Sequence, residues 1–321
     1  MSILDHSFPS GRFAVVDIET TGLSAAMDRI VEISIFHVDG PGQVRQVLNT
    51  LVNPRRRVAG TEIHGITDED VRRAPTFEDI APLVASLLSG RVMAAHNVYF
   101  DIRFVSNELQ LCGFPGQFPH VCTMYLPPML GTGAKLSLDD ACSELGIGRK
   151  NAHCAADDAL ACSEILTRQL ALSASLGVTS YRELAKRKKY KFADSFILSP
   201  LTAVSPARSP TLLARSPHQP SAALSADDLA RAEHRLWMRR YYDALVTAIS
   251  DLELSDAEAE QLQSIAYAGG LRPSELRAAH ARVFAAFINQ YLDDEVIDKE
   301  ERQVLASVWA SLRRLGWAPG E

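Results

Sequence analysis

Two acidic residues lie in a stretch of sequence that is otherwise apolar. Residues 13–23 read FAVVDIETTGL and carry Asp17 and Glu19. On a strand, side chains two residues apart leave the same face. Two carboxylates on one face repel each other unless a cation lies between them, and hard oxygen ligands suit Mg²⁺ or Mn²⁺. The pair therefore indicates a divalent-cation site, or else a strand that ends near Ile18 and leaves both acids in solvent.

Two later segments add a third acid, a fourth acid and a histidine. Asp101 follows HNVYF, where its carboxylate suits the positive end of a helix. His153 precedes a run of small residues, and Asp158 comes five residues later. An acid among small residues that approach a sheet is costly unless it is paired or bound to metal. Asp101 as an ordinary N-cap and His153 as a cap or surface group are the alternatives at these positions.

The surrounding hydrophobic pattern predicts the elements that position these residues. Residues 13–18 form a continuous apolar run, as in a strand that is buried on both faces. We expect further strands at 30–38, 44–52 and 91–97, and helices at 77–89, 101–111, 137–145 and 154–173. Ser137 is the predicted N-cap of the third helix. Strands come first and helices interleave later, which predicts an α/β fold with a mixed sheet covered by helices.

Four motifs taken together resemble a known family. VDIETTGL, HNVYFDIRF and HCAADDA resemble the three motifs of the DnaQ-like, or DEDDh, 3′–5′ exonucleases, and IHGITDED (63–70) is similar to the segment between the first two. The resemblance covers about residues 11–172. It implies an RNase H-like fold and hydrolysis of phosphodiester bonds with two metal ions, Mg²⁺ or Mn²⁺.

The resemblance also implies a role for each of the five residues. Asp17 would bridge both cations, Glu19 and Asp158 would complete the ligands of one, and Asp101 would hold the other. Two cations about 3.5–4 Å apart stabilise the attacking and leaving oxygens of an in-line displacement. His153 would act as the general base, a role that an unperturbed pKa of ~6.5 suits near neutral pH.

Substrate contacts follow from the same resemblance. Thr20, Thr21 and His64 would lie against the terminal nucleotide, and Leu23 would stack on its base or wedge it. His64 as a plain loop residue is the alternative. Before the third motif the family commonly has an Asp-Thr pair, and here Cys122 stands in place of the Asp. That Asp is outside the catalytic set, so we expect activity to be retained.

Composition divides the chain of 321 residues into parts. Residues 1–190 are the predicted exonuclease domain. Residues 191–224 repeat Ser-Pro and read as a flexible linker. Residues 225–321 are predicted to be helical and to carry the net charge of −6, and they resemble TerB-like domains. No run approaches ~18 apolar residues and no signal peptide is recognised, so we expect a cytoplasmic protein without a membrane anchor.

The helical part contains an internal repeat. Ser255 and Glu258 stand three residues apart after an acidic turn, and Asp298 and Glu301 repeat that spacing. In both copies the spacing is that of a capping box. The repeat predicts a pseudo-symmetric helical bundle.

The sequence predicts a 3′–5′ exonuclease that acts on single-stranded ends and releases 5′-mononucleotides. DNA is the expected substrate, ahead of RNA. A proofreading, epsilon-like subunit of a DNA polymerase and an RNA-processing exoribonuclease are the alternatives within the class, because the choice of DNA or RNA depends on a pocket for the 2′-OH. The predicted helical domain would then bind a polymerase, another protein or nucleic acid. A non-catalytic scaffold is the alternative from another class, but such proteins lose one or more acids, and this chain retains all four.

Overall fold

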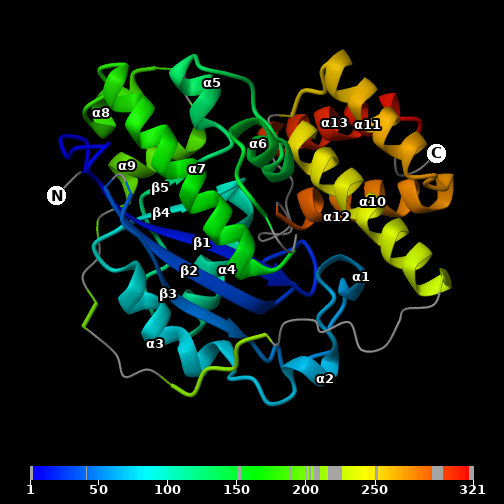
Figure 1. Ribbon diagram of the computed structural model, residues 1–321, viewed down its shortest axis with the longest axis horizontal. Helices are drawn as coiled ribbons and strands as arrows, with labels where there is room; N and C mark the ends of the chain where they lie inside the picture. The colour runs from blue at the N-terminus through cyan, green and yellow to red at the C-terminus, as the bar shows by residue number, and fades with distance from the viewer. Residues whose placement is uncertain are drawn as a thin grey trace. The chain divides into compact units, whose positions relative to one another are not determined.

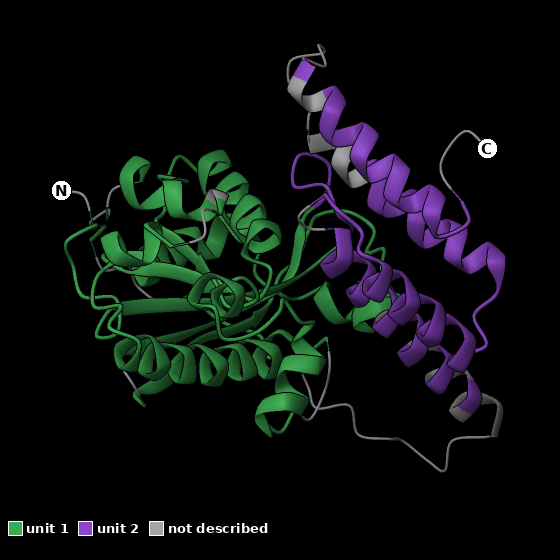
Figure 2. Ribbon diagram, turned by 90° about the horizontal axis from the view of Figure 1, so that it is seen from above, with its two compact units in different colours: residues 1–21, 29–215 green, residues 22–28, 216–321 purple. Residues whose placement is uncertain are grey.

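The computed structural model describes residues 3–40, 42–149, 153–187, 190–199, 201, 204–205, 210–215, 226–249, 252–290 and 299–317. The chain divides into two compact units, which Figure 2 shows in two colours. Unit 1 comprises Met1–Thr21 and Arg29–Arg215, and unit 2 comprises Gly22–Asp28 and Ser216–Glu321.

Unit 1 is built on a mixed sheet of five strands (Figure 1). The strands are β1 (Arg12–Thr20), β2 (Ile30–Asp39), β3 (Val44–Leu51), β4 (Val92–Ala95) and β5 (His120–Cys122). Their order is β3-β2-β1-β4-β5, so β1 lies at the centre, as its continuous apolar run predicts. β1 pairs antiparallel with β2 and parallel with β4. The predicted mixed sheet is confirmed.

Helices surround the sheet and connect its strands. They are α1 (Thr61–His64), α2 (Asp68–Val71), α3 (Phe77–Leu88), α4 (Val98–Leu111), α5 (Leu126–Leu130), α6 (Leu138–Leu145), α7 (Ala155–Ser175), α8 (Tyr181–Ala185) and α9 (Ser195–Leu198), with a 3₁₀ turn at Lys191–Asp194. Ser137 caps α6, as predicted, by accepting a hydrogen bond from the Asp140 N–H. The helix predicted to begin at Asp101 begins one turn earlier.

The two faces of β1 and β2 are covered by different helices. The face that carries Phe13, Val15, Phe36 and Val38 packs against α7, and all four residues share a core cluster with Ala159 and Leu166 of that helix. On the opposite face, the His37 ring bonds to the Leu87 carbonyl oxygen of α3 at 2.9 Å. Figure 1 shows α7 and α3 on opposite sides of the sheet.

The face beneath α7 changes from apolar to polar along the strands. Phe13 pairs with Val38 and Val15 with Phe36, whereas Asp17 pairs with Ser34 and Glu19 with Glu32. Since side chains alternate along a strand, all of these residues point toward α7. The apolar end holds the helix on the sheet, and the polar end lies beneath its N-terminus.

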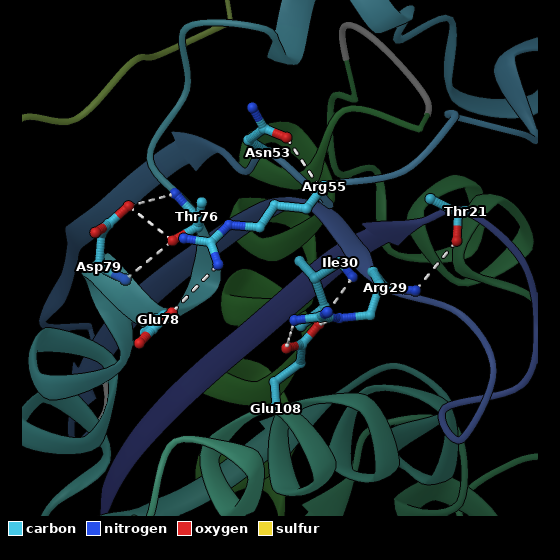
Figure 3. Close-up of polar contacts among 9 residues, drawn as sticks. All are labelled: Thr21, Arg29, Ile30, Asn53, Arg55, Thr76, Glu78, Asp79 and Glu108. Carbon is cyan, nitrogen blue, oxygen red and sulfur yellow. Dashed lines mark hydrogen bonds and ion pairs between the residues drawn. The ribbon is translucent and has the colours of Figure 1, made fainter.

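A buried ion pair ties the start of β2 to α4 (Figure 3). The Arg29 guanidinium donates to both carboxylate oxygens of Glu108, at 2.7 and 2.6 Å. The Arg29 N–H donates to the hydroxyl of Thr21, which follows β1. Together these contacts fix the chain on either side of the loop 22–28. Figure 3 also shows the capping box of Thr76 and Asp79 that begins α3.

Unit 2 contains α10 (Ala226–Ile249), α11 (Asp256–Ala268), α12 (Pro273–Gln290) and α13 (Lys299–Arg314). Its core includes Tyr241, Leu245, Leu262 and Leu312. The first predicted capping box is confirmed, because Ser255 and Glu258 bond reciprocally at the start of α11. In the second copy of the repeat, Asp298 lies outside the described residues. Among the helices that the structure describes, none is long and apolar enough to cross a membrane.

Candidate active site

Three of the predicted site residues meet at the N-terminus of α7. Ligand atoms of Glu19, His153 and Asp158 lie within 4.8 Å of one another. Glu19 is 8% exposed, so it is not a solvated acid at the end of a strand, and Asp158 in α7 is 4% exposed. β1 continues through both Asp17 and Glu19 to Thr20, and Asp17 is partly buried. The alternative that the strand ends near Ile18 is therefore wrong.

Asp101 reaches the same group from α4. The N-cap of that helix is Asn97, so the N-cap role considered for Asp101 is excluded. Asp101 lies in the first turn and is 4% exposed. The backbone of Ile18, in β1, hydrogen-bonds to its carboxylate. This contact places the Asp101 carboxylate beside the β1 residue that separates Asp17 from Glu19.

The electrostatics of the site are those of crowded carboxylates. Burial raises the pKa of Glu19 to about 8, and the charge of Asp158 contributes while His153 opposes the rise. Burial, followed by the charges of Asp158 and Asp101, raises the pKa of Asp17 well above its usual value. Burial likewise raises the pKa of Asp101. Each acid thus disfavours the ionised form of the next, and positive charge among them would relieve the repulsion.

His153 has an unusual backbone conformation immediately before α7. Its φ is +60°, in the left-handed region that non-glycine residues seldom adopt. Its N–H donates to the Asp158 carboxylate at 3.0 Å, and Cys154 is the N-cap of α7. The side chain is partly buried. His153 lies just before the helix, as predicted. Asp157 is less buried than Asp158, which agrees with the choice of Asp158 as the inward acid.

Arg149 supplies positive charge to this group of acids. Its Nε and Nη2 donate to the two carboxylate oxygens of Asp158, at 2.6 and 2.7 Å. It also pairs with Asp139 of α6. Its side chain is only 7% exposed, so the pair is largely withdrawn from solvent. No motif in the sequence marks Arg149.

The residues predicted to bind substrate fall into two groups. Thr20 ends β1, Thr21 follows it, and both are buried. His64, also buried, bonds to the Ala59 carbonyl oxygen and accepts from the Ile66 N–H. A Cβ at Gly60 would lie 3.2 Å from the His64 ring and 3.6 Å from the Thr20 carbonyl oxygen, so His64 and the end of β1 are close. Leu23 instead belongs to unit 2 and packs against its core.

Glu32 is a further site residue that the sequence analysis missed. It is fully buried on β2, directly opposite Glu19. Its Oε2 accepts from the N–H of Ala155, the first residue of α7, at 3.2 Å. The available signal was an acid within the apolar run IVEIS, the same pattern that marks Asp17. Arg215, which pairs with Glu32 at 3.4 Å, had no comparable signal, because it lies in the Ser-Pro region.

The donor set fits a divalent cation. Glu19, Asp158 and the His153 imidazole come together, and Asp17 and Asp101 are near enough to interact with them electrostatically. Carboxylate oxygens are the ligands that Mg²⁺ and Mn²⁺ prefer. Burial first, and then repulsion among the acids, raises the pKa of Asp17 and of Glu19, and a bound cation would offset that repulsion. Such a donor set suits metal-assisted hydrolysis.

The fold and the site define a nuclease. A model of the family described as Exonuclease matches residues 14–166, which include all five residues of the site. The chain is 33% identical over 166 residues to DNA polymerase III subunit epsilon of Treponema pallidum. The matched stretch covers 50% of this chain and 76% of that protein. The chain therefore belongs to the exonuclease family, with the RNase H-like fold that the motifs predict.

Two other similarities concern parts of larger or related proteins. DNA polymerase III PolC-type of Thermotoga maritima is 32% identical over 187 residues, 57% of this chain but only 14% of that protein. The chain thus spans about one seventh of this relative. A structure of exonuclease X in complex with 5′ overhanging duplex DNA has a TM-score of 0.43 and 24% identity, and covers 57% of this chain and 99% of that one.

Proposed function

We propose that the protein is a 3′–5′ exonuclease that removes 5′-mononucleotides from single-stranded DNA ends. The convergence of Glu19, His153 and Asp158 within 4.8 Å carries the proposal, because it brings together acids and a base from two distant segments. Membership of the exonuclease family supports it. The direction of attack and the preference for DNA rest on the motifs and on the DNA polymerase relatives.

The chain's own residues divide the work of hydrolysis. Asp17, Glu19, Asp101 and Asp158 would hold two divalent cations, Mg²⁺ or Mn²⁺. When bound, such cations stabilise the charge on the attacked phosphate and on the leaving oxygen. His153 would accept the proton of the attacking water, since an imidazole can exchange protons near neutral pH. Asp158, which binds the His153 N–H, would hold that residue in place.

The end of the substrate would lie beside the last residues of β1. Thr20, Thr21 and His64 form one buried group there, and we propose that they contact the terminal nucleotide. Leu23, which packs against the core of unit 2, is proposed to stack on or wedge the terminal base.

An assay with 5′-labelled oligonucleotides tests the activity and its direction. Single-stranded DNA or RNA would be incubated with Mg²⁺ and the full-length protein. Removal from the 3′ end gives a ladder of progressively shorter labelled products, whereas removal from the 5′ end releases the label at once. Asp17→Asn should abolish the ladder without a change in side-chain size. A wild-type protein that shortens neither substrate would contradict the proposal and would favour the scaffold alternative.

The third motif offers a matched pair of variants. Asp158→Asn removes the buried carboxylate, whereas Asp157→Asn makes the same chemical change on the adjacent, less buried residue. We expect Asp158→Asn to be inactive and Asp157→Asn to retain nearly full activity. Equal losses in the two variants would contradict the assignment of Asp158.

A proofreading role is the second candidate, because one relative is a DNA polymerase III subunit epsilon. We infer a catalytic domain at 1–190 and a helical accessory domain at 225–321 that binds a polymerase or another protein in the cytoplasm. Within the predicted linker at 191–224, α9 and residues 211–215 belong to unit 1. Its resemblance to TerB-like domains stays a prediction. Capture of a polymerase subunit by the full-length protein, lost when residues 225–321 are removed, would support this role.

A further inference from the structure

The chain between the two predicted domains is bonded to unit 1 at several described positions. The Val204 N–H donates to the Ser89 hydroxyl after α3, at 2.8 Å. Leu213 is held on both sides: its carbonyl oxygen accepts from the Leu51 N–H at 2.8 Å, and its N–H donates to the Thr50 hydroxyl at 3.1 Å. The contacts of Leu213 lie beside the last two residues of β3, an edge strand of the sheet, and Arg215 reaches Glu32 of β2.

Arg215, at the end of this segment, makes three contacts with parts of the candidate site. Its Nη1 donates to the His153 carbonyl oxygen at 3.1 Å and lies 3.4 Å from Oε2 of Glu32. Its Nη2 donates to the His64 carbonyl oxygen at 2.5 Å. The side chain is 21% exposed and Glu32 is fully buried. One guanidinium thus connects the third motif, the IHGIT segment and the buried acid opposite Glu19.

These contacts fall where the backbone requires support. His153 is in a left-handed conformation, which is strained for a non-glycine residue and persists only when the surroundings hold it. Its N–H is bound by Asp158 and its carbonyl oxygen by Arg215. Two residues further along the chain, the Ala155 N–H donates a hydrogen bond to Glu32. Arg215 and Glu32 therefore act on the same short segment from its two sides.

The geometry points to Arg215 as a positioning residue of the active site: it fixes the backbone at His153 and His64 from the linker and compensates the charge of Glu32. The inference rests on the proposed exonuclease function. The planar guanidinium suits the role because it presents several donors in a fixed fork, which a lysine ammonium does not. The segment 211–215 is then part of the working catalytic unit.

The first test measures the backbone directly, without catalysis. Hydrogen exchange of the full-length Arg215→Ala protein should be several-fold faster than wild type in peptides that cover residues 61–66 and 153–158, and unchanged in α3. Leu213→Pro, which removes the N–H anchor two residues earlier, should do the same while Arg215 is retained. The control is Arg182→Ala, because Arg182 pairs with Asp5 in an exposed ion pair.

The second test is kinetic. Because small misplacements of reacting groups cost up to ~10²-fold, we expect Arg215→Ala to lower kcat roughly 10- to 100-fold with a smaller effect on KM. Arg215→Lys should recover only part of this loss, and guanidinium at a non-denaturing concentration should partly restore Arg215→Ala. Arg182→Ala should match wild type in all of these measurements.

The outcomes separate the two proposals. A wild-type protein without nuclease activity overturns the proposed function, and hydrogen exchange then decides whether Arg215 fixes the two segments. If exchange at 61–66 and 153–158 is unchanged in Arg215→Ala, the inference is overturned. If exchange increases but kcat stays at the wild-type value in an active enzyme, Arg215 is a structural residue only, and the positioning role is overturned.

Discussion

The ion pair between Arg29 and Glu108 provides a quantitative test of how the first motif is held. Glu108 is 1% exposed and its partner guanidinium is about one third exposed, at 35%. Both carboxylate oxygens of Glu108 accept hydrogen bonds from Arg29. Figure 3 also shows a longer bond, in which the Ile30 N–H donates to Glu108 Oε1 at 3.4 Å. Removal of Arg29 therefore leaves a carboxylate that is buried and almost unsupported.

Arg29→Met keeps most of the apolar stem and removes the charge. Breaking a buried pair in this way costs about 3–5 kcal/mol, and we expect about 3 kcal/mol here because one partner is partly exposed. Glu108→Gln leaves Arg29 with access to water, so its cost should be about 1 kcal/mol. The double variant Arg29→Met/Glu108→Leu should be more stable than Arg29→Met alone, since no buried charge remains unpaired.

Urea unfolding followed by far-UV circular dichroism measures these differences. Tryptophan fluorescence is unsuitable, because all three tryptophans lie in unit 2, at positions 237, 309 and 317. Arg182→Ala is the control, with an expected loss below about 0.5 kcal/mol for an exposed pair. Equal losses for Arg29→Met and Glu108→Gln, or a loss below about 1 kcal/mol for Arg29→Met, would refute the reasoning.

Three further predictions concern catalysis and stability. His153→Ala should lower the rate by ~10²–10⁴-fold and leave binding of substrate largely intact; an unchanged rate near neutral pH would remove His153 from the role of base. Removal of divalent cations with a chelator should abolish nuclease activity, and added Mg²⁺ or Mn²⁺ should restore it; activity that survives exhaustive chelation would argue against a metal-dependent site. Burial lowers the pKa of His37 from its usual 6.5 to about 4, so the folded state binds the proton less well than the unfolded state. The contribution of His37 to stability should therefore fall between about pH 6.5 and pH 4. His37→Gln keeps a donor for the Leu87 carbonyl oxygen but does not titrate, so the melting temperature of wild type should fall relative to that of this variant over the same interval; identical profiles would contradict it.

Much of the secondary structure of unit 1 can be predicted from short stretches of sequence. The apolar run of β1, the Ser137 cap and the small residues at the start of α7 depend on neighbours along the chain, and each was predicted. The boundary of α4 was predicted one turn late, because Asn97 begins the helix in a left-handed conformation that no strong capping pattern announces.

The five candidate residues also follow from short stretches of sequence. Asp17 and Glu19 share a face because side chains alternate along a strand, and the spacing of His153 and Asp158 matches a family motif. Their meeting with Asp101 required the resemblance as well, since nothing in the spacing alone brings three distant segments together. Burial then decided between the alternatives, because Glu19 and Asp158 are withdrawn from solvent.

The tertiary structure alone decided the supporting contacts. Glu32 lies opposite Glu19 through the register of β1 and β2, and register is a property of two strands rather than one. Arg149 and Arg215 reach the acids from segments without periodicity, and Arg215 comes from a region whose composition reads as a linker. Hydrophobic pattern and motif determined which residues could form a metal-dependent nuclease site. Cross-strand pairing and the return of the chain along β3 determined which charges surround it, because those contacts join residues that local sequence cannot relate.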